Sequence, residues 1–315
     1  MRRTITVIIA CMLLLALLPA CEMIGVPEPS LSCLTTPEPS SMQGVLPSAT
    51  PEATSLPSQS GEVDVIKPFP FGRVIVFEDP VVEEVIRAAL QKPKGPVTDQ
   101  DMLEVVSFNS RNTDEKKIKT LDDLRWCVNL MHITLGNTGI TDISVLKGMQ
   151  NLWTFECIDQ LDDYTPLLSH KNLRLISLNG VTDGFFRKLI ATCSNLKHVY
   201  LYQSDVSAEA IRMLADKFEL RTLSLGNCGI KDVSPFVGFT GLSYLSLENN
   251  LIKDISPLAE NTQLRYWTIN LRNNKITDWS PLESLKLCTL YVKGNPVTEG
   301  PALDELARNG LTIKQ

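Results

Sequence analysis

Histidine is scarce in this sequence, and the familiar catalytic motifs are missing from it. Only His132, His170 and His198 are present in 315 residues, which leaves little scope for histidine-based metal or triad chemistry. The sequence contains no GxxxxGK[S/T] loop, no HExxH or GxSxG motif and no EF-hand loop. It also lacks a CxxC pair and any cysteine–histidine cluster, so nothing supports zinc. These absences favour a non-enzymatic binding protein, with no catalytic residues, no metal site and no cofactor.

Positive charge is also in deficit. The chain has 30 lysines and arginines against 36 aspartates and glutamates, for a formal net charge of -6. Nonspecific binding to nucleic acid requires a basic surface that neutralises phosphates. We therefore expect no nucleic-acid partner.

The first twenty residues have the pattern of an export signal. Two arginines follow Met1, and the fourteen residues from Ile5 to Leu18 are apolar apart from Thr6. A helix of that length spans about 21 Å, which is less than a hydrocarbon core of about 30 Å. This favours a cleaved signal peptide over a transmembrane helix.

The end of this segment, Leu18-Pro19-Ala20-Cys21, resembles the bacterial lipobox. The resemblance implies cleavage before Cys21, lipidation of its sulfur and attachment to the cell membrane at the extracytoplasmic face. Membrane contact would then be made through the lipid anchor only. The alternative is an ordinary secretory signal that happens to be followed by a cysteine.

Residues 21–66 are predicted to form a disordered tether behind the lipidated cysteine. This segment is rich in serine and threonine and carries seven prolines, at positions 27, 29, 37, 39, 47, 51 and 57. It has few large apolar residues, so it cannot bury enough surface to offset its conformational entropy.

A leucine repeat runs through most of the remaining chain. Leucines open successive units at positions 130, 152, 173, 196, 220, 242, 264 and 287. In the clearest copy, Leu242 is followed by the alternating pair Leu245 and Leu247, by Asn250 at a bend, and by a second apolar cluster. One such unit cannot enclose a core, whereas stacked units bury a continuous one.

This pattern closely resembles the leucine-rich repeat family, and the turns at 141–144 and 253–258 are similar to the 22-residue internalin-type repeat. The resemblance implies an α/β solenoid with short parallel strands on its concave face. Residues 76–103 resemble the helical cap of bacterial surface repeat proteins, with helices beginning after Asp79 and at Thr98. The predicted organisation is a signal peptide at 1–20, the tether at 21–66, the N-terminal cap and a first atypical repeat at 67–129, leucine-rich repeats at 130–297 and a C-terminal cap at 298–315.

Three segments depart from the repeat. Residues 109–117 are an insertion, which we interpret as a loop. The units that begin at Leu173 and Leu196 carry residues 184–191 and 208–215 in place of the usual turn. These units resemble longer cysteine-containing leucine-rich repeats, and the resemblance implies that the two segments are real helices. The unit that begins at Leu264 contains an insertion, and we expect Ile269 and Leu271 to be its inward-facing pair.

Several columns of repeated residues have structural explanations. Aspartates recur at positions 142, 163, 183, 232, 254 and 278. Each precedes a tight turn, so capping of local backbone N–H groups is favoured over a calcium-binding ladder. The family resemblance implies that Asn250, Asn274 and Asn295 hydrogen-bond the buried backbone. Cys127, Cys157 and Cys193 are expected to be small core residues with free thiols.

The concave face carries the strongest functional signal. Alternation along each strand sends the residues between the leucines outward, and four of the six tyrosines fall at such positions. Tyrosine and arginine are frequent anchors of protein interfaces, although tyrosine also suits any exposed strand. The candidate partner-binding residues are His198, Tyr200, Tyr202, Tyr244, Glu248, Arg272 and Tyr291.

The leading hypothesis is a membrane-anchored, surface-exposed protein that binds another protein through this face. A glycan-binding surface module is the alternative, because exposed tyrosines also stack against sugar rings. A hydrolase is a third hypothesis, and it depends on a weak acid–base pair of Glu156 and His132 on adjacent strands.

Overall fold

The structure is a computed structural model that describes residues 72–111, 117–217, 220–261, 268–285 and 289–315. The chain divides into two compact units, Met1–Val65 and Ile66–Gln315, and all described residues belong to the second. The predicted export signal, Cys21 and the tether lie outside the described residues. So do most of the 109–117 insertion and the leucines at 264 and 287.

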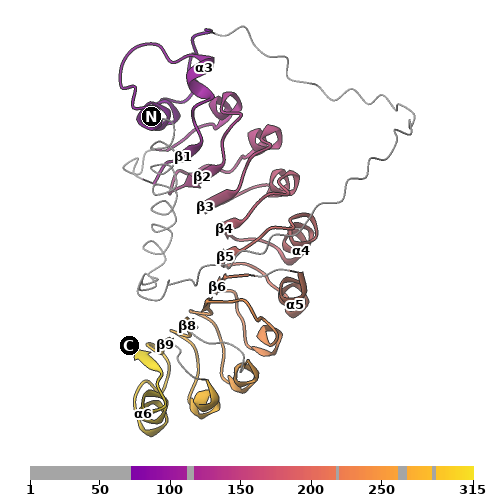
Figure 1. The fold of residues 1–315 in the computed structure, drawn as a ribbon, viewed down its shortest axis with the longest axis vertical. Coiled ribbons are helices and arrows are strands. Elements are labelled where there is room, and N and C mark those ends of the chain that lie inside the picture. Colours follow the sequence, from indigo (N-terminus) through magenta and orange to yellow (C-terminus); the bar gives the residue numbers. More distant parts are fainter. Residues whose placement is uncertain (1–71, 112–116, 218–219, 262–267, 286–288) are drawn as a thin grey trace, which may run out of the picture. The chain divides into compact units, whose positions relative to one another are not determined.

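Ten parallel strands form one sheet, in which each strand pairs with the next along the chain (Figure 1). The strands are β1 (Ser107–Asn109), β2 (His132–Leu135), β3 (Thr154–Gln160), β4 (Leu175–Asn179), β5 (His198–Tyr202), β6 (Thr222–Gly226), β7 (Tyr244–Ser246), β8 (Thr268–Asn270), β9 (Thr289–Tyr291) and β10 (Thr312–Lys314). This is the α/β solenoid that the leucine period predicts, and the predicted fold class is confirmed.

Short helical segments carry the chain from one strand to the next, on the side of this unit away from the strands (Figure 1). Six are 3-10 helices: η3 (Asp122–Trp126), η4 (Ser144–Gly148), η5 (Thr165–Ser169), η6 (Ser234–Phe236), η7 (Ser256–Glu260) and η8 (Ser280–Ser284). The two units predicted to contain real helices form α4 (Asp183–Thr192) and α5 (Ala208–Lys217). The Thr182 side chain caps α4 by accepting a hydrogen bond from the Phe185 N–H.

Two helices precede the first strand and begin where their capping residues predict. Helix α2 (Pro80–Ala89) follows Asp79, which caps it, and has proline at its first position. Helix α3 (Asp99–Met102) has a complete capping box formed by Thr98 and Asp101. At the other end, α6 (Pro301–Arg308) and β10 lie within the segment predicted to be the C-terminal cap.

The core is a continuous stack of apolar side chains, to which each strand contributes inward-facing residues. The first inward residues of β2 to β9 are all fully buried, and they are Ile133, Phe155, Ile176, Val199, Leu223, Leu245, Ile269 and Leu290. Ile269 pairs in register with Leu245 and Leu290, and Leu271 is fully buried as well. The inward pair predicted for the irregular unit at 264 is therefore right.

The cysteines of the core behave as small apolar residues. Cys127, Cys157 and Cys193 are buried, and burial raises the pKa of the Cys127 and Cys157 thiols to about 12. Both therefore stay protonated at physiological pH. Within the described part of the chain, no helix combines the length and the apolar composition needed to cross a membrane.

Candidate functional site

The outward side chains of the strands form the surface predicted to bind a partner, which we call the strand face. Strand register arranges them in rows that run across the sheet. The first row, where the strands begin, comprises Ser107, His132, Thr154, Leu175, His198, Thr222, Tyr244, Thr268, Thr289 and Thr312. The middle row comprises Asn109, Thr134, Glu156, Ser177, Tyr200, Ser224, Ser246, Asn270, Tyr291 and Lys314.

A third row follows the ends of the strands. Asn179, Tyr202 and Gly226 are register partners in it. Glu248 and Arg272 continue it, since the N–H of Asn227 donates to the Glu248 carbonyl and that of Asn249 donates to the Arg272 carbonyl. All seven predicted partner-binding residues lie in these three rows.

The four tyrosines differ widely in exposure, contrary to expectation. Tyr200 and Tyr291 are 9% and 7% exposed, Tyr244 is partly buried, and Tyr202 is 39% exposed. Tyr200 and Tyr291 stand in the middle row, where side chains from both neighbouring strands, about 4.8 Å away, flank them. The expectation that all four serve as exposed anchors needs correction, because only Tyr202 offers a large part of its surface.

The tyrosines also fail to form one patch. Tyr200 and Tyr291 are four strands apart, a separation of about 19 Å. Ser224, Ser246 and Asn270 occupy the middle row between them. The face therefore has a polar centre, and its exposed aromatic ring lies in the third row.

Tyr202 projects beside a glycine that leaves room for its ring. A Cβ atom built on Gly226 would lie 2.9 Å from Cδ2 of Tyr202 and 3.9 Å from Cγ of Glu248. Any larger residue at position 226 would displace the ring. Because Gly226 has no side chain, the Tyr202 ring can lie across it. This role of Gly226 was not predicted from the sequence.

The predicted polar residues already have partners within the protein. The guanidinium carbon of Arg272 lies 4.4 Å from the centroid of the Tyr291 ring, and its Nη2 donates to the Gln315 carbonyl oxygen at 3.1 Å. Glu248 Oε2 accepts a hydrogen bond of 2.7 Å from Asn270 Nδ2. His198 Nδ1 lies 3.0 Å from Thr222 Oγ1. These contacts hold the side chains in place, but they leave fewer polar atoms of each residue available to bind a ligand.

An ion pair on the first strands was not predicted. Arg111 Nη2 lies 2.9 Å from Glu156 Oε2, and the Thr134 hydroxyl donates to Glu156 Oε1 at 3.2 Å. The side chains of Arg111 and Glu156 are only 12% and 10% exposed. Burial raises the pKa of the Glu156 carboxyl, and the Arg111 charge and the hydrogen bonds oppose that shift.

The hypothetical acid–base pair of Glu156 and His132 has a different geometry from the one expected. Thr134, not His132, is the register partner of Glu156. The His132 ring instead packs edge-on against Trp153, with ring centroids 6.4 Å apart. No hydrogen bond or ion pair joins these two residues in the described structure, so the arrangement gives the hydrolase hypothesis no support.

The aspartate column caps turns. Five of its members accept a hydrogen bond of 2.8–2.9 Å from the backbone N–H two residues later, and they are Asp142, Asp163, Asp232, Asp254 and Asp278. The backbone N–H of Ser234 is the main cause that lowers the pKa of Asp232, whereas the Ser256 hydroxyl, followed by the Ser256 N–H, lowers the pKa of Asp254. Asp183 differs, because it opens α4 and accepts from the Ser207 N–H. Across the described ranges, no three acidic, histidine or cysteine side chains are grouped so as to hold a metal ion.

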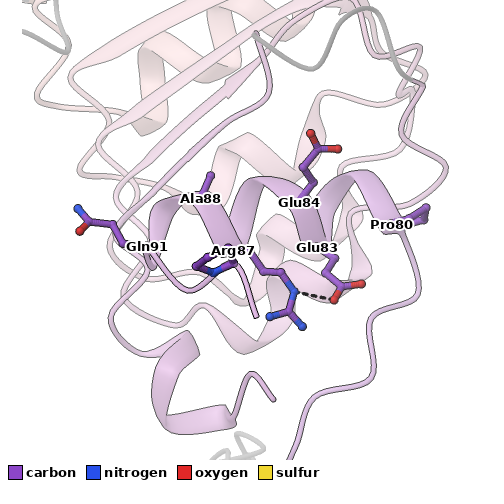
Figure 2. A pocket seen from close by; sticks show the side chains of 7 residues that line it. Pro80, Glu83, Glu84, Arg87, Ala88 and Gln91 are labelled. Carbon is purple, nitrogen blue, oxygen red and sulfur yellow. Dashed lines mark hydrogen bonds and ion pairs between the residues drawn. The ribbon is translucent and has the colours of Figure 1, made fainter. Parts of the chain in front are cut away.

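A surface pocket lies beside α2 (Figure 2), and none of the predicted binding residues lines it. Its lining comprises Pro80, Glu83, Glu84, Arg87, Ala88, Gln91 and Pro93. Arg87 Nε donates to Glu83 Oε1 at 2.8 Å, and Arg87 Nη1 donates to the Gly95 carbonyl. The central cation is thus engaged by the protein itself, and the pocket contains no nucleophile beside a base.

Comparisons with known proteins agree with this architecture. A family model described as Leucine Rich repeats (2 copies) matches residues 219–260. The crystal structure of the internalin InlF from Listeria monocytogenes is similar with a TM-score of 0.59 and 26% identity, covering 76% of this chain and 77% of that one. The functional domain of InlJ from the same organism gives a TM-score of 0.52 at 18% identity, covering 75% of this chain and 54% of that one. No curated protein matches the sequence. The chain thus has an internalin-like leucine-rich repeat fold.

Proposed function

We propose that this protein is a non-enzymatic module that binds a partner protein through its strand face. The observation that carries the proposal is a continuous ten-stranded sheet whose outward rows present polar side chains and one exposed aromatic ring. Hydrogen bonding between successive strands orders the surface before binding. A preorganised surface loses less conformational entropy when a partner docks.

Glycan binding is the second candidate function. It is favoured by the exposure of Tyr202, whose ring lies across Gly226 and can stack against a sugar. Tyr200 and Tyr291 are buried and Tyr244 is partly buried, which leaves this candidate with one well-exposed stacking residue. A protein partner can also use the polar rows. Protein binding is therefore the stronger proposal.

Truncation of the exposed ring tests both candidates. Tyr202→Ala should weaken binding of an identified partner about 30-fold, because an aromatic interface anchor contributes about 2 kcal/mol. The measurement is titration of purified partner after identification by pull-down, with a glycan array run in parallel. Leu251→Ala is the matched control, since Leu251 is 44% exposed but lies outside the strands. Equal affinity of wild type and Tyr202→Ala would contradict the site.

We further propose that Cys21 anchors the chain to the extracytoplasmic face of the cell membrane. The support is the sequence Leu18–Cys21, which resembles a lipobox, behind a short apolar segment. A diacylglycerol supplies two acyl chains, which are enough for stable attachment.

Replacement of the lipidated cysteine should release the protein. In cell fractionation, Cys21→Ala is expected to move most of the protein out of the membrane fraction, whereas Cys33→Ala should leave it membrane-bound. Retention of the Cys21→Ala protein in the membrane fraction would overturn the anchor.

A further inference from the structure

A row of basic residues lies at the edge of the sheet where β4, β5 and β6 begin. Arg174, Lys197 and Arg221 each immediately precede one of these strands, and Trp153 occupies the same position before β3. Backbone hydrogen bonds of 2.8 Å join each member of the series to the previous one, from Trp153 to Arg221. The backbones of neighbouring members are therefore about 4.8 Å apart, the spacing of adjacent strands. We call Arg174, Lys197 and Arg221 the basic edge.

The first cation of the basic edge is held in position by an aromatic ring. The guanidinium carbon of Arg174 lies 4.5 Å from the centroid of the Trp153 ring, close enough for a cation–π interaction. The His132 ring lies T-shaped to the same indole, with the ring centroids 6.4 Å apart. Arg174 is exposed despite this contact, so its charge is both oriented and available.

Two of the three cations of the basic edge have no acidic partner in the described part of the chain. Neither Arg174 nor Arg221 belongs to an ion pair in the described structure. The adjacent first-row residues Thr154, Leu175 and Thr222 are uncharged. Burial lowers the pKa of His198 in the same row, and the positive charges of Arg221 and Lys197 lower it further. The positive potential thus extends onto the strand face of a chain whose net charge is -6.

We propose that the basic edge binds an acidic, extended polypeptide segment of the partner, with carboxylates paired to Arg174 and Arg221. The proposal rests on the proposed function and specifies the chemistry of the partner. The two arginines are two strands apart, about 10 Å, a distance that an extended chain covers in about three residues. Arginine suits this role because its planar guanidinium forms bidentate pairs with carboxylates.

A peptide fits the basic edge better than other polyanions. Proteins that bind single-stranded nucleic acid combine a long basic groove with aromatic rings on which bases stack. Here the ring beside Arg174, that of Trp153, already packs against Arg174 and His132. Recognition must therefore depend on carboxylates that match a short row of cations.

The test uses a fluorescein-labelled peptide of alternating glutamate and serine, titrated with the full chain and followed by anisotropy. The double variant Arg174→Gln/Arg221→Gln is expected to bind the peptide about tenfold more weakly than wild type. Lys231→Gln/Lys253→Gln is the matched control, because both lysines are exposed, one lies in each of two successive repeats, and the change in net charge is the same. That control should stay within about twofold of wild type. Circular dichroism and thermal melting check that each variant is folded.

Three results would overturn the proposal. One is an equal loss of peptide binding in both double variants, and another is binding of heparin or an oligonucleotide of matched charge as tightly as the peptide. The third is that Arg174→Gln/Arg221→Gln binds the partner as tightly as wild type while Tyr202→Ala binds the partner more weakly. The proposed function would then stand, but without a role for the basic edge. Conversely, peptide binding that depends on the basic edge, together with partner binding that ignores Tyr202→Ala, would remove the strand-face site alone.

Discussion

Replacing Asn250 by aspartate is expected to destabilise the protein by about 4 kcal/mol at neutral pH. The Asn250 side chain is 3% exposed and makes five hydrogen bonds. Its Oδ1 accepts from the N–H groups of Cys228 and Ile230, and its Nδ2 donates to the carbonyls of Leu225, Leu247 and Glu248. A carboxylate of the same shape would keep the two accepted bonds. It would also turn a buried negative charge toward three carbonyl oxygens.

The loss should depend on pH. Burial and the three carbonyl oxygens favour the neutral form of the introduced carboxyl, so its pKa in the folded state rises above the usual value of about 3.9. The native state then binds more protons than the unfolded state, and stability falls as pH rises above about 4. Urea unfolding midpoints at pH 4 and pH 7 should therefore show the smaller deficit at pH 4.

Asn249→Asp is the matched control for this substitution. Asn249 is the preceding residue, has a positive φ of 56°, and uses its Oδ1 to accept a bond of 2.9 Å from Asn273 Nδ2. An aspartate can accept the same bond and tolerates this backbone conformation. If both variants unfolded at the same urea concentration, the amide of Asn250 would not have the role assigned to it.

Replacing Asp79 by alanine is expected to lower the free energy of unfolding by about 3 kcal/mol. Asp79 is fully buried, and its Oδ1 caps α2 by accepting from the N–H groups of Val81 and Val82. Its Oδ2 accepts from the N–H groups of Lys119, at 2.6 Å, and Thr120. Alanine would leave these donors without their acceptor and would release α2 from a segment forty residues further along the chain.

Two further variants separate the cap from the tie to Lys119 and Thr120. Asp79→Asn keeps one acceptor oxygen but faces the remaining N–H donors with an amide NH₂, so its unfolding midpoint in urea should lie between those of wild type and Asp79→Ala. Asp278→Ala removes an exposed turn cap and should shift the midpoint much less. Equal shifts for Asp79→Ala and Asp278→Ala would show that the buried contacts contribute little.

Local features of the sequence were sufficient to predict much of the fold. The leucine period predicted the parallel sheet and even the inward pair Ile269 and Leu271, because stacked repeats place equivalent residues in register. Helix starts at Asp79 and Thr98 were predictable because a cap depends on a few neighbouring residues. The proposed role of Cys21 also comes from the sequence, and it stays a prediction because the residue lies outside the described structure.

The candidate site was predicted less well, for a physical reason. Alternation indicates on which side of a strand a side chain lies, but not how closely its neighbours crowd it. The seven residues chosen from the sequence do lie on the strand face, yet Tyr200 is almost buried while Tyr202, two residues later, is exposed. The exposed ring also depends on Gly226, which belongs to the next strand.

Local sequence patterns were thus enough to predict the parallel strands, the starts of α2 and α3 and much of the apolar core. Contacts between residues distant in the chain needed the tertiary structure. Arg111 and Glu156 are 45 residues apart and meet only when the strands stack. Arg174, Lys197 and Arg221 recur with the repeat but precede the strands, where alternation does not predict orientation. Their alignment into one positive edge depends on how the folded repeats superpose, so it became visible only in three dimensions.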